Sequence, residues 1–246
     1  MLRSLVGSEM CIRDRVSIMN RICIVPARGG STRFPNKNIS LLDNKPLIFH
    51  TLDIIDGLFD QIIFTSDCNI MLDMVCERYA NIETSPRPEE LASNTSKVID
   101  TVNYYHDSMR NVDQIWLCLP TCPLRMEKDV INAQKLLTGN VDSVISITDY
   151  EFPPTLGLTR DAEEMIFDWH DSNPWQNNNH RSQDHPVIYR PNGAIYGSWS
   201  GAFKERRNFY KGRVKGYYMP KERSIDIDNK IDLRMAQIIL EDRNAN

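Results

Sequence analysis

Short apolar runs alternate with amphipathic segments through the first two thirds of the sequence, and this alternation constrains the fold more than any other feature. The apolar runs lie at residues 22–27, 61–66, 115–119 and 143–147. Segments with helical periodicity lie between them, at residues 46–56, 70–79, 98–109 and 128–137. Such alternation forms mostly parallel sheets, and near-continuous apolar strands are those that helices cover on both faces. We therefore predict a three-layer α/β fold with a mostly parallel, Rossmann-like sheet.

A long irregular stretch interrupts this pattern between Tyr150 and Pro191. It is rich in Pro, Asn, His and Gln, and no period in it is long enough for a regular element. A loop of this length is usually a lid, a binding loop or an excursion that forms a dimer contact. Strand-like alternation returns at residues 193–199 and 213–220, before a closing helix at 230–240. That helix is expected to pack through one apolar stripe: Ile231, Met235, Ile238 and Ile239.

The charge balance and the apolar content exclude several classes of function. Lys and Arg number 29 and Asp and Glu 33, so the formal net charge is −4. Such a chain lacks the general basic surface that holds nucleic acid, and no nucleic-acid partner is expected. No apolar run reaches the roughly 18 residues of a membrane-spanning helix, so no membrane contact is expected. The six Cys residues have neither metal-type spacing nor the density of a disulfide scaffold, which predicts reduced thiols in a cytoplasmic protein.

Residues 1–18 are expected to lie outside the fold. They carry three Arg residues but neither the apolar core nor the cleavage site of a secretory signal. The segment resembles a translated adaptor or vector sequence, and Met19 stands just before the first predicted strand, where a natural start would fall. The alternative is a native N-terminal arm. The predicted domain therefore comprises residues 19–246, with the excursion at residues 150–220.

A glycine-rich basic loop, PARGGSTRFPNKN at residues 26–38, directly follows the first predicted strand. The carboxyl edge of a parallel sheet is where α/β folds bind ligands. Gly29 and Gly30 let the backbone approach an anion with its N–H groups turned inward. Three basic residues supply charge for a polyphosphate: Arg28, Arg33 and Lys37. The loop lacks the patterns of a P-loop and of a dinucleotide-binding turn, and taken alone it equally suits a solvated turn.

In its length and in the order of its residues, this motif resembles the nucleotide-binding signature of the sugar-acid cytidylyltransferases, which make CMP-sialic acids. Four further blocks similar to that family follow in the same order: RPEELA at 87–92, PTCPLR at 120–125, RPNGAIY at 190–196 and SIDID at 224–228. The resemblance implies a fold of the nucleotide-diphospho-sugar transferase type and a homodimer. It also implies transfer of CMP from CTP to the anomeric hydroxyl of a nonulosonic acid, a step in the synthesis of surface polysaccharide.

The resemblance also implies how CTP would be held. Arg28 and Lys37 would bind the triphosphate together with backbone amides of the loop, those of Gly29, Gly30 and Ser31. Asn38 and Arg87 would face the cytidine.

Two carboxylates stand two residues apart in the segment Ile225–Asp228. On a strand, Asp226 and Asp228 would project from one face while the Ile side chains point into the core. Such a pair suits Mg²⁺ or Mn²⁺, because a substrate triphosphate fills the remaining coordination positions. The pattern alone equally fits solvated acids on an edge strand or an N-cap at Asp228. The resemblance favours the metal site, since the matching carboxylates of similar enzymes hold the metal and act in catalysis with Arg28 and Lys37.

The RPNGAIY block combines groups that suit an acidic nine-carbon sugar. Arg190 is predicted to pair with the sugar carboxylate, and Tyr196 to hydrogen-bond the sugar or wall its pocket, with Asn192 between them. The Asn192-Gly193 pair equally fits a turn before a strand.

Other positions bear on the sugar through the resemblance alone. Phe209 and Tyr210 fall where the family carries an aromatic pair that a partner subunit delivers toward the sugar; the alternative is a pair of core aromatics. Leu119 stands where sialic-acid-activating relatives carry a Gln that meets the sugar, and Leu156 where a sugar-contacting Lys is common. These departures leave the identity of the acid open.

We expect a CMP-nonulosonate synthetase that favours an N-acylneuraminate or legionaminate-like acid. The alternatives are a cytidylyltransferase for 3-deoxy-octulosonate and a non-catalytic nucleotide-sugar-binding protein on the same scaffold, since a fold does not guarantee chemistry.

Overall fold

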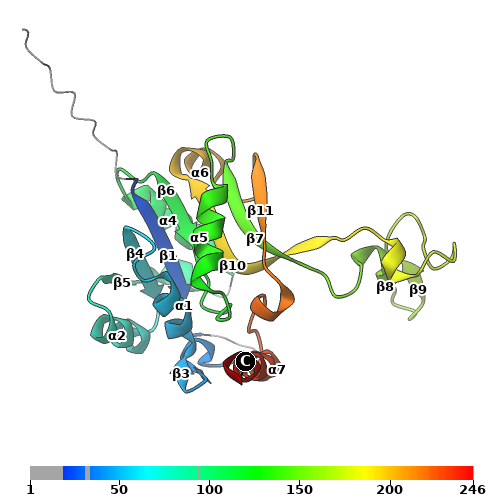
Figure 1. Ribbon diagram of the computed structural model, residues 1–246, viewed down its shortest axis with the longest axis horizontal. Coiled ribbons are helices and arrows are strands. Elements are labelled where there is room, and N and C mark those ends of the chain that lie inside the picture. The colour runs from blue at the N-terminus through cyan, green and yellow to red at the C-terminus, as the bar shows by residue number, and fades with distance from the viewer. Residues whose placement is uncertain (1–18, 31–33, 94, 246) are drawn as a thin grey trace, which may run out of the picture.

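The computed structural model describes residues 19–30, 34–93 and 95–245. Within them, the main sheet has seven strands in the order β11-β7-β10-β6-β1-β4-β5 (Figure 1). In chain order they are β1 (Arg21–Ala27), β4 (Gln61–Ser66), β5 (Ile82–Pro86), β6 (Gln114–Leu117), β7 (Ser143–Asp149), β10 (Tyr189–Trp199) and β11 (Val214–Tyr218). All neighbouring pairs are parallel except those that β10 makes with β6 and β7. The predicted mostly parallel sheet is confirmed.

Helices cover both faces of this sheet, as its apolar strands predict. The cover consists of α1 (Leu47–Ile55), α2 (Asn69–Arg78), α4 (Val98–Ser108), α5 (Glu127–Leu136) and α6 (Ser200–Arg206). Cys23 and Val25 of β1 belong to the core that includes side chains of α1, α2 and α5. Ile22 and Ile24, on the opposite face, belong to the core that includes side chains of α4 and α6. The predicted three-layer α/β fold is therefore confirmed.

The closing helix, α7 (Lys230–Ala245), packs on a third and smaller core near the carboxyl edge of the sheet. The predicted packing stripe is wrong in most of its members: Ile231, Met235 and Ile238 are 68%, 48% and 57% exposed. The helix packs instead through a neighbouring stripe, namely Leu233, Ala236, Ile239 and Leu240. Both stripes have helical spacing, so the position of the partner surface decides which one is buried.

Short elements complete the chain. They are β2 (Leu41–Leu42), β3 (Lys45–Pro46), α3 (Glu89–Ala92), β8 (Leu158–Arg160), β9 (Ile166–Asp168) and four 3₁₀ turns: η1 (Lys37–Ile39), η2 (Pro154–Leu156), η3 (Ser182–Asp184) and η4 (Lys221–Arg223). The hairpin β8–β9, the turns η2 and η3 and the start of β10 lie in the stretch where the sequence predicts no regular element, so that expectation holds only outside them.

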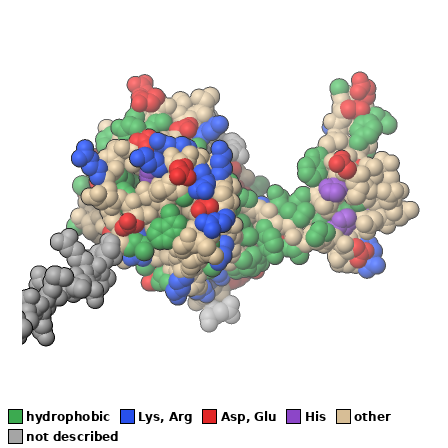
Figure 2. All heavy atoms as spheres, turned by 90° about the horizontal axis from the view of Figure 1, so that it is seen from above, with side chains coloured by type: hydrophobic (Ala, Val, Ile, Leu, Met, Phe, Trp, Pro, Cys, Tyr) green, Lys and Arg blue, Asp and Glu red, His purple; other side chains and the backbone are tan. Residues whose placement is uncertain are grey.

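The irregular stretch between β7 and β10 forms an arm that stands away from the sheet (Figure 1). Hydrophobic side chains gather on the arm and on its connection to the body (Figure 2). The large exposed ones are Phe152, Leu158, Met165, Ile166, Phe167, Trp169, Trp175 and Val187. Because monomers rarely expose large apolar patches, the arm is a candidate interaction surface.

Some predictions concern residues outside the described ranges. These are the N-terminal segment 1–18 and, in the glycine-rich loop, Ser31 and Arg33. No helix among the described residues is long and apolar enough to cross a membrane. Five cysteines in the described part of the chain are free: Cys23, Cys68, Cys76, Cys118 and Cys122.

Candidate active site at the carboxyl edge of the sheet

The glycine-rich loop begins where β1 ends, at the carboxyl edge of the sheet. The backbone N–H of Gly29 donates to Asp67 Oδ1 at 2.8 Å, in the segment that follows β4. Arg28 Nη2 donates to the carbonyl of Gly30 at 3.0 Å. A Cβ at Gly29 would lie 3.0 Å from the Cβ of Cys68, so glycine permits these two loops to approach closely.

Asn38 and Arg87 carry buried polar atoms without a hydrogen-bond partner in the described part of the chain. Asn38, in η1, donates from Nδ2 to the carbonyl of Arg28 at 2.9 Å, while its Oδ1 accepts nothing. Arg87 follows β5; its Nη2 donates to the carbonyl of Thr65 at 3.2 Å, while its Nε donates to nothing. Burial lowers the pKa of Arg87, and Asp67 opposes this effect. Because native proteins pair nearly all buried polar atoms, this corner retains hydrogen-bonding capacity for a ligand.

The acidic segment has no regular secondary structure, and this corrects the sequence prediction of a strand. It follows η4, and the backbone N–H of Ile227 donates to the carbonyl of Thr121 at 2.8 Å instead of to a neighbouring strand. Ile227 is fully buried, as the alternation predicts. Asp228 is not the N-cap of α7, because Asn229 Oδ1 accepts the backbone N–H groups of Ile231 and Asp232 at 2.7 and 3.1 Å.

Lys37 and the two carboxylates lie together. Lys37 Nζ donates to Asp228 Oδ1 at 3.1 Å and joins the glycine-rich loop to the acidic segment. Asp226 keeps solvent-exposed surface, yet protein atoms crowd its carboxyl group, and this desolvation raises its pKa. A hydrogen bond from Thr121 lowers that pKa, and the charge of Asp228 raises it. The like charges of Asp226 and Asp228 favour the binding of a cation at this pair.

The donor set fits a hard divalent cation. Asp226 and Asp228 offer carboxylate oxygens only, which are the ligands that Mg²⁺ prefers. No group of three or more His, Cys, Asp or Glu side chains in the described ranges could hold a metal ion by itself. A cation at this pair would therefore draw its other ligands from substrate and water.

Gly193 brings the predicted sugar block to the acidic segment. Its φ of +80° lies in the left-handed region, and the register of β10 against β7 shifts between Pro191 and Tyr196. A Cβ at Gly193 would lie 3.1 Å from Cys122 Sγ, 3.6 Å from Leu119 Cδ1 and 3.8 Å from Asp226 Oδ2. The bulge thus brings the RPNGAIY, PTCPLR and SIDID blocks together at one point.

Asn192 has a different role from the predicted sugar contact. Its side chain is 1% exposed, and Oδ1 accepts from Ser146 Oγ at 2.6 Å and from the backbone N–H of Ala194 at 3.1 Å. Its Nδ2 donates to Ser224 Oγ at 2.9 Å. A contact with a sugar would require breaking these bonds, so Asn192 fixes the bulge and holds the start of the acidic segment.

The aromatic residues of the predicted sugar site pack on one another. Tyr196 lies 5.6 Å from Phe209 and 6.1 Å from Tyr210 between ring centroids, and the two tyrosine oxygens are 3.4 Å apart. Phe209 is 2% exposed and packs on Phe203 at 4.8 Å, so it is a core aromatic and not a residue presented to a partner. Tyr210 is 52% exposed. Burial, Tyr210, Cys122 and Asp226 all raise the pKa of Tyr196, which keeps its phenol protonated.

Arg190 and Leu156 lie further from this point, toward the arm. Arg190 opens the sugar block, and its Nη1 donates to the carbonyl of Pro191 at 3.4 Å. Leu156, in η2, is 2% exposed, and its carbonyl accepts from Trp175 Nε1 at 3.0 Å. No described contact joins either residue to Asp226 or Tyr196.

Residues that the sequence reasoning did not select also shape the site. Asp67 holds the glycine-rich loop, and its only signal is an acid directly after a strand. Arg125 ends the PTCPLR block and is 1% exposed. Its Nη2 donates to the carbonyl of Leu119, while Nε and Nη1 have no hydrogen-bond partner in the described ranges. The same block supplies Cys122 and Thr121. It follows β6, which lies between β1 and β10, and so it lies between the glycine-rich loop and the predicted sugar block.

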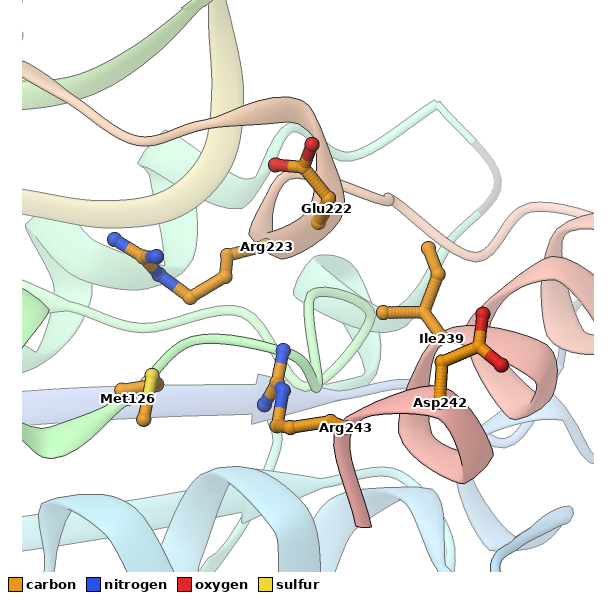
Figure 3. Close-up of a pocket in the computed structure, with 6 residues that line it drawn as sticks. All are labelled: Met126, Glu222, Arg223, Ile239, Asp242 and Arg243. Carbon is orange, nitrogen blue, oxygen red and sulfur yellow. The ribbon is translucent and has the colours of Figure 1, made fainter. Parts of the chain in front are cut away.

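A cavity of about 440 Å³ lies on another side of η4, and none of the predicted site residues lines it. Its walls come from η4, from α7 and from the segment before α5: Met126, Glu222, Arg223, Ile239, Asp242 and Arg243 (Figure 3).

Comparison with known proteins agrees with the motifs. Residues 22–179 match the model of the family described as Cytidylyltransferase. The N-acylneuraminate cytidylyltransferase of Streptococcus agalactiae serotype V is 32% identical over 219 residues, which cover 87% of this chain and 52% of that protein. The chain thus spans about half the length of that relative. The pseudaminic acid cytidylyltransferase of Campylobacter jejuni is 26% identical over 228 residues, which cover 90% of this chain and 96% of that protein.

A solved structure shares the fold. The CMP:2-keto-3-deoxy-manno-octonic acid synthetase complexed with CTP superposes with a TM-score of 0.65 at 12% identity, covering 91% of this chain and 99% of the other. The order of the sequence blocks, the sheet topology and the family match all agree. This chain belongs to the cytidylyltransferase family.

Proposed function

We propose that this chain transfers CMP from CTP to the anomeric hydroxyl of a nonulosonic acid, giving a CMP-sugar and pyrophosphate. One observation carries the proposal. Lys37 of the nucleotide loop bonds to Asp228, while Asp226 lies beside Gly193 of the sugar block. A triphosphate on the loop and a sugar at the bulge would therefore meet at the two carboxylates. The proposed compartment is the cytoplasm.

Asn38 and Arg87 would recognise the cytosine ring. Cytosine carries an amino donor next to ring acceptors, and the buried atoms at this corner are one acceptor, Asn38 Oδ1, and one donor, Arg87 Nε. Uracil has a carbonyl in place of the amino group and would face Asn38 Oδ1 with a second acceptor. A site that leaves a buried polar atom unpaired rejects the wrong ligand strongly, so this pair supports selection of CTP.

Arg28 and Lys37 would hold the triphosphate with the amides of Gly29, Gly30 and Ser31. Their charges would neutralise the phosphate oxygens while the substrates are aligned for in-line attack at the α-phosphorus. Asp226 and Asp228 would hold Mg²⁺ or Mn²⁺, which supplies charge stabilisation to the reacting phosphate when bound. Binding of the cation would also compensate the like charges that raise the pKa of Asp226.

On the sugar side, Tyr196 and Arg190 are the proposed contacts. The phenol of Tyr196 stays protonated, and so it can donate a hydrogen bond to the sugar. Arg190 would pair with the sugar carboxylate. Leu119 offers an apolar contact beside Gly193. We propose an N-acylneuraminate or legionaminate-like acid, because the RPNGAIY and SIDID blocks resemble the sialic-acid branch of the family, and the part of that acid against Leu119 would need no hydrogen bond.

The proposed partner is a second copy of the chain. The arm exposes aromatic and aliphatic side chains far from the sheet, and a homodimer would bury them. The arm begins directly after β7 and returns into β10, so a dimer contact there would be continuous with the sugar block.

The test is pyrophosphate release with CTP and Mg²⁺ against N-acetylneuraminate, legionaminate, pseudaminate and 3-deoxy-octulosonate, beside an Asp228→Ala control. Release with one acid that is lost in the control establishes the reaction and names the substrate. Release with 3-deoxy-octulosonate alone would replace the nonulosonate proposal. If the protein is folded and binds CTP but releases no pyrophosphate with any of these acids, the result would favour a nucleotide-sugar-binding protein instead.

A further inference from the structure

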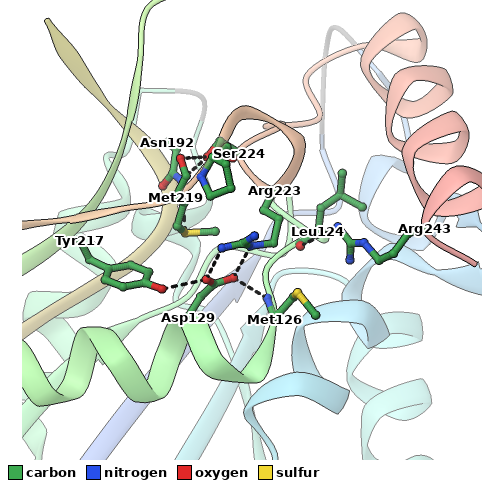
Figure 4. A network of polar contacts seen from close by, with 10 residues as sticks. Leu124, Met126, Asp129, Asn192, Tyr217, Met219, Arg223, Ser224 and Arg243 are labelled. Atoms are coloured by element: carbon green, nitrogen blue, oxygen red, sulfur yellow. Dashed lines mark hydrogen bonds and ion pairs between the residues drawn. The ribbon is translucent and has the colours of Figure 1, made fainter. Parts of the chain in front are cut away.

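Asp129 is a buried carboxylate outside the predicted site, and its hydrogen bonds join three separate parts of the fold. It lies in the first turn of α5 and has no exposed surface. Arg223 donates from Nε to Oδ2 and from Nη2 to Oδ1, each at 2.9 Å (Figure 4). The Tyr217 hydroxyl donates to Oδ1 and the Met126 backbone N–H to Oδ2, each also at 2.9 Å. A bidentate guanidinium, a phenol and an amide together satisfy this carboxylate.

These bonds fix the turn from which the acidic segment starts. Tyr217 belongs to β11, which leads into η4, and Arg223 is the last residue of η4. The next residue, Ser224, is held as well, because its Oγ accepts from Asn192 Nδ2 at 2.9 Å and donates to the carbonyl of Met219 at 3.1 Å. Figure 4 shows the two sets of contacts side by side on this turn. The two residues that precede the acidic pair and Ile225, namely Arg223 and Ser224, are therefore both held by hydrogen bonds.

Beyond Ser224 the main chain has few anchors. Ile227 N–H bonds to the carbonyl of Thr121 at 2.8 Å, and Asp228 N–H bonds to Asp232 Oδ2 at 2.8 Å, within the start of the following helix. Asp226 lies between these bonds and the anchored turn. Thr121 holds the carboxyl group of Asp226 by a hydrogen bond, whereas the turn places its main chain, and a displacement of about 1 Å at a reacting group can cost about 10²-fold in rate.

We propose that Asp129, Arg223 and Tyr217 are positioning residues for the carboxylates of Asp226 and Asp228. The proposal rests on the proposed function, because it concerns the carboxylates that would hold the divalent cation. None of the three residues needs to touch a substrate. A buried, hydrogen-bonded ion pair contributes less to net stability than to the choice of one geometry, which is the property that a metal-holding segment requires.

A second network in the same chain provides a matched control. Asp53 accepts hydrogen bonds from the Tyr79 hydroxyl, from Arg78 Nη2 at 3.2 Å and from Lys45 Nζ at 2.9 Å. It has the same chemistry, a carboxylate with an arginine and a tyrosine, but it ties α1 to α2 and β3. None of its members belongs to β11, η4 or the acidic segment.

The experiment compares Asp129→Asn, Tyr217→Phe and Asp53→Asn in the full chain. Binding of Mn²⁺ in the presence of CTP, measured from the electron spin resonance signal of free Mn²⁺, needs no turnover. Pyrophosphate release then gives kcat, the KM for CTP and the Mg²⁺ concentration for half-maximal rate. All assays are run below the melting temperature of the least stable variant.

Asp129→Asn is expected to weaken Mn²⁺ binding and to lower kcat, each by about tenfold or more, with a change in the KM for CTP below about threefold. Tyr217→Phe, which removes one hydroxyl and keeps the ion pair, is expected to show the same pattern at about threefold. It remains informative if Asp129→Asn does not fold. Asp53→Asn is expected to lower the melting temperature without changing Mn²⁺ binding.

The outcomes separate the two proposals. If the unaltered protein binds no Mn²⁺ with CTP, the metal role of Asp226 and Asp228 fails, and the positioning role falls with it. If the unaltered protein binds Mn²⁺ but the Asp129 and Tyr217 variants bind it equally well, only the positioning role is overturned. In that case the Asp129 network would be structural, like that of Asp53.

Discussion

The proposed nucleotide side and the proposed sugar side of the site are built on different principles. Arg28, Asn38 and Arg87 follow the carboxyl ends of parallel strands, and Asn38 and Arg87 are buried with part of their hydrogen-bonding capacity unused. The sugar side lies on the one antiparallel strand, β10, at a bulge beside an exposed arm. A buried corner would suit the part of the proposed substrates that does not change, the cytidine, whereas a bulged strand and an arm could vary with the proposed acid.

The largest effect is expected where the two sides join, at Asp228. Asp228→Ala removes the partner of Lys37 and one of the two proposed metal ligands. Loss of one such charge-stabilising group lowers kcat by about 10²–10³-fold. Pyrophosphate release should fall by that factor, with Asp73→Ala on the exposed face of α2 as the control. A loss below tenfold would show that the two sides do not meet at this carboxylate.

The nucleotide side alone is tested by Asn38→Ala and Arg87→Met. Removing a buried hydrogen-bond partner costs about 1–3 kcal/mol, so the KM for CTP should rise about 10- to 100-fold. Asn38→Ala should also reduce the preference for CTP over UTP, because its Oδ1 is the buried acceptor proposed to face the amino group. The KM for the sugar should stay unchanged. An equal rise for both substrates would argue against a rigid, separate cytidine corner.

The parallel half of the fold is the part that the sequence predicts well. Its strands β1, β4, β6 and β7 are near-continuous apolar runs, so local pattern and tertiary partner agree, whereas β5, with the sequence IETSP, has no such run and is not predicted. In α7 local pattern and tertiary partner do not agree. Apolar residues occupy two stripes, and only the surface beneath decides that Ala236 is buried while Met235 stays exposed. The alternation at Ile225–Asp228 likewise suggests a strand, but the backbone N–H of Ile227 bonds to a loop carbonyl and not to a strand.

Only the parts of the site that lie within short sequence motifs can be predicted from the sequence. The glycine-rich loop and the acidic pair are each a short contiguous stretch of sequence, and the structure joins the two stretches through Lys37 and Asp228. Asp129 escaped notice because its partners Tyr217 and Arg223 lie 88 and 94 residues away. The RPNGAIY block predicts a sugar contact for Asn192, and its actual partner, Ser146, lies 46 residues away and carries no local signal. Contacts between distant buried polar groups leave no periodicity in a single sequence.

The sugar side is tested through the arm. Ile166, at the start of β9, is 64% exposed, and Ile166→Asp replaces this apolar side chain with a charged one. If a second copy covers this surface, the dissociation constant of the dimer should rise at least about tenfold, since a buried unpaired charge opposes association. Sedimentation equilibrium measures the dimer, and calorimetry with CTP checks that nucleotide binding is unchanged. Asp161→Asn, on the same arm, controls for the loss or gain of a charge.

A dimer that persists in Ile166→Asp would place the partner surface elsewhere. Loss of CTP binding together with the dimer would mean that the nucleotide corner is not independent of the sugar side.

The smallest effect concerns Asp226, the carboxylate that faces both sides. Its pKa is raised, mainly by desolvation, so the folded protein binds this proton more tightly than the unfolded chain does. The ionised group therefore opposes folding above the folded pKa, and this penalty disappears as the pH falls through the raised value toward the ordinary one. Asp226→Asn should raise the melting temperature of the metal-free protein at pH 7 by a few degrees, and the gain should shrink as the pH approaches 4. Thermal melts across that range measure it, with Asp73→Asn as the control. A gain independent of pH would mean that removal of the Asp226 charge is not its cause. Addition of Mg²⁺ with CTP should reverse the order of stability, because an aspartate at position 226 offers the cation a charged ligand and an asparagine does not.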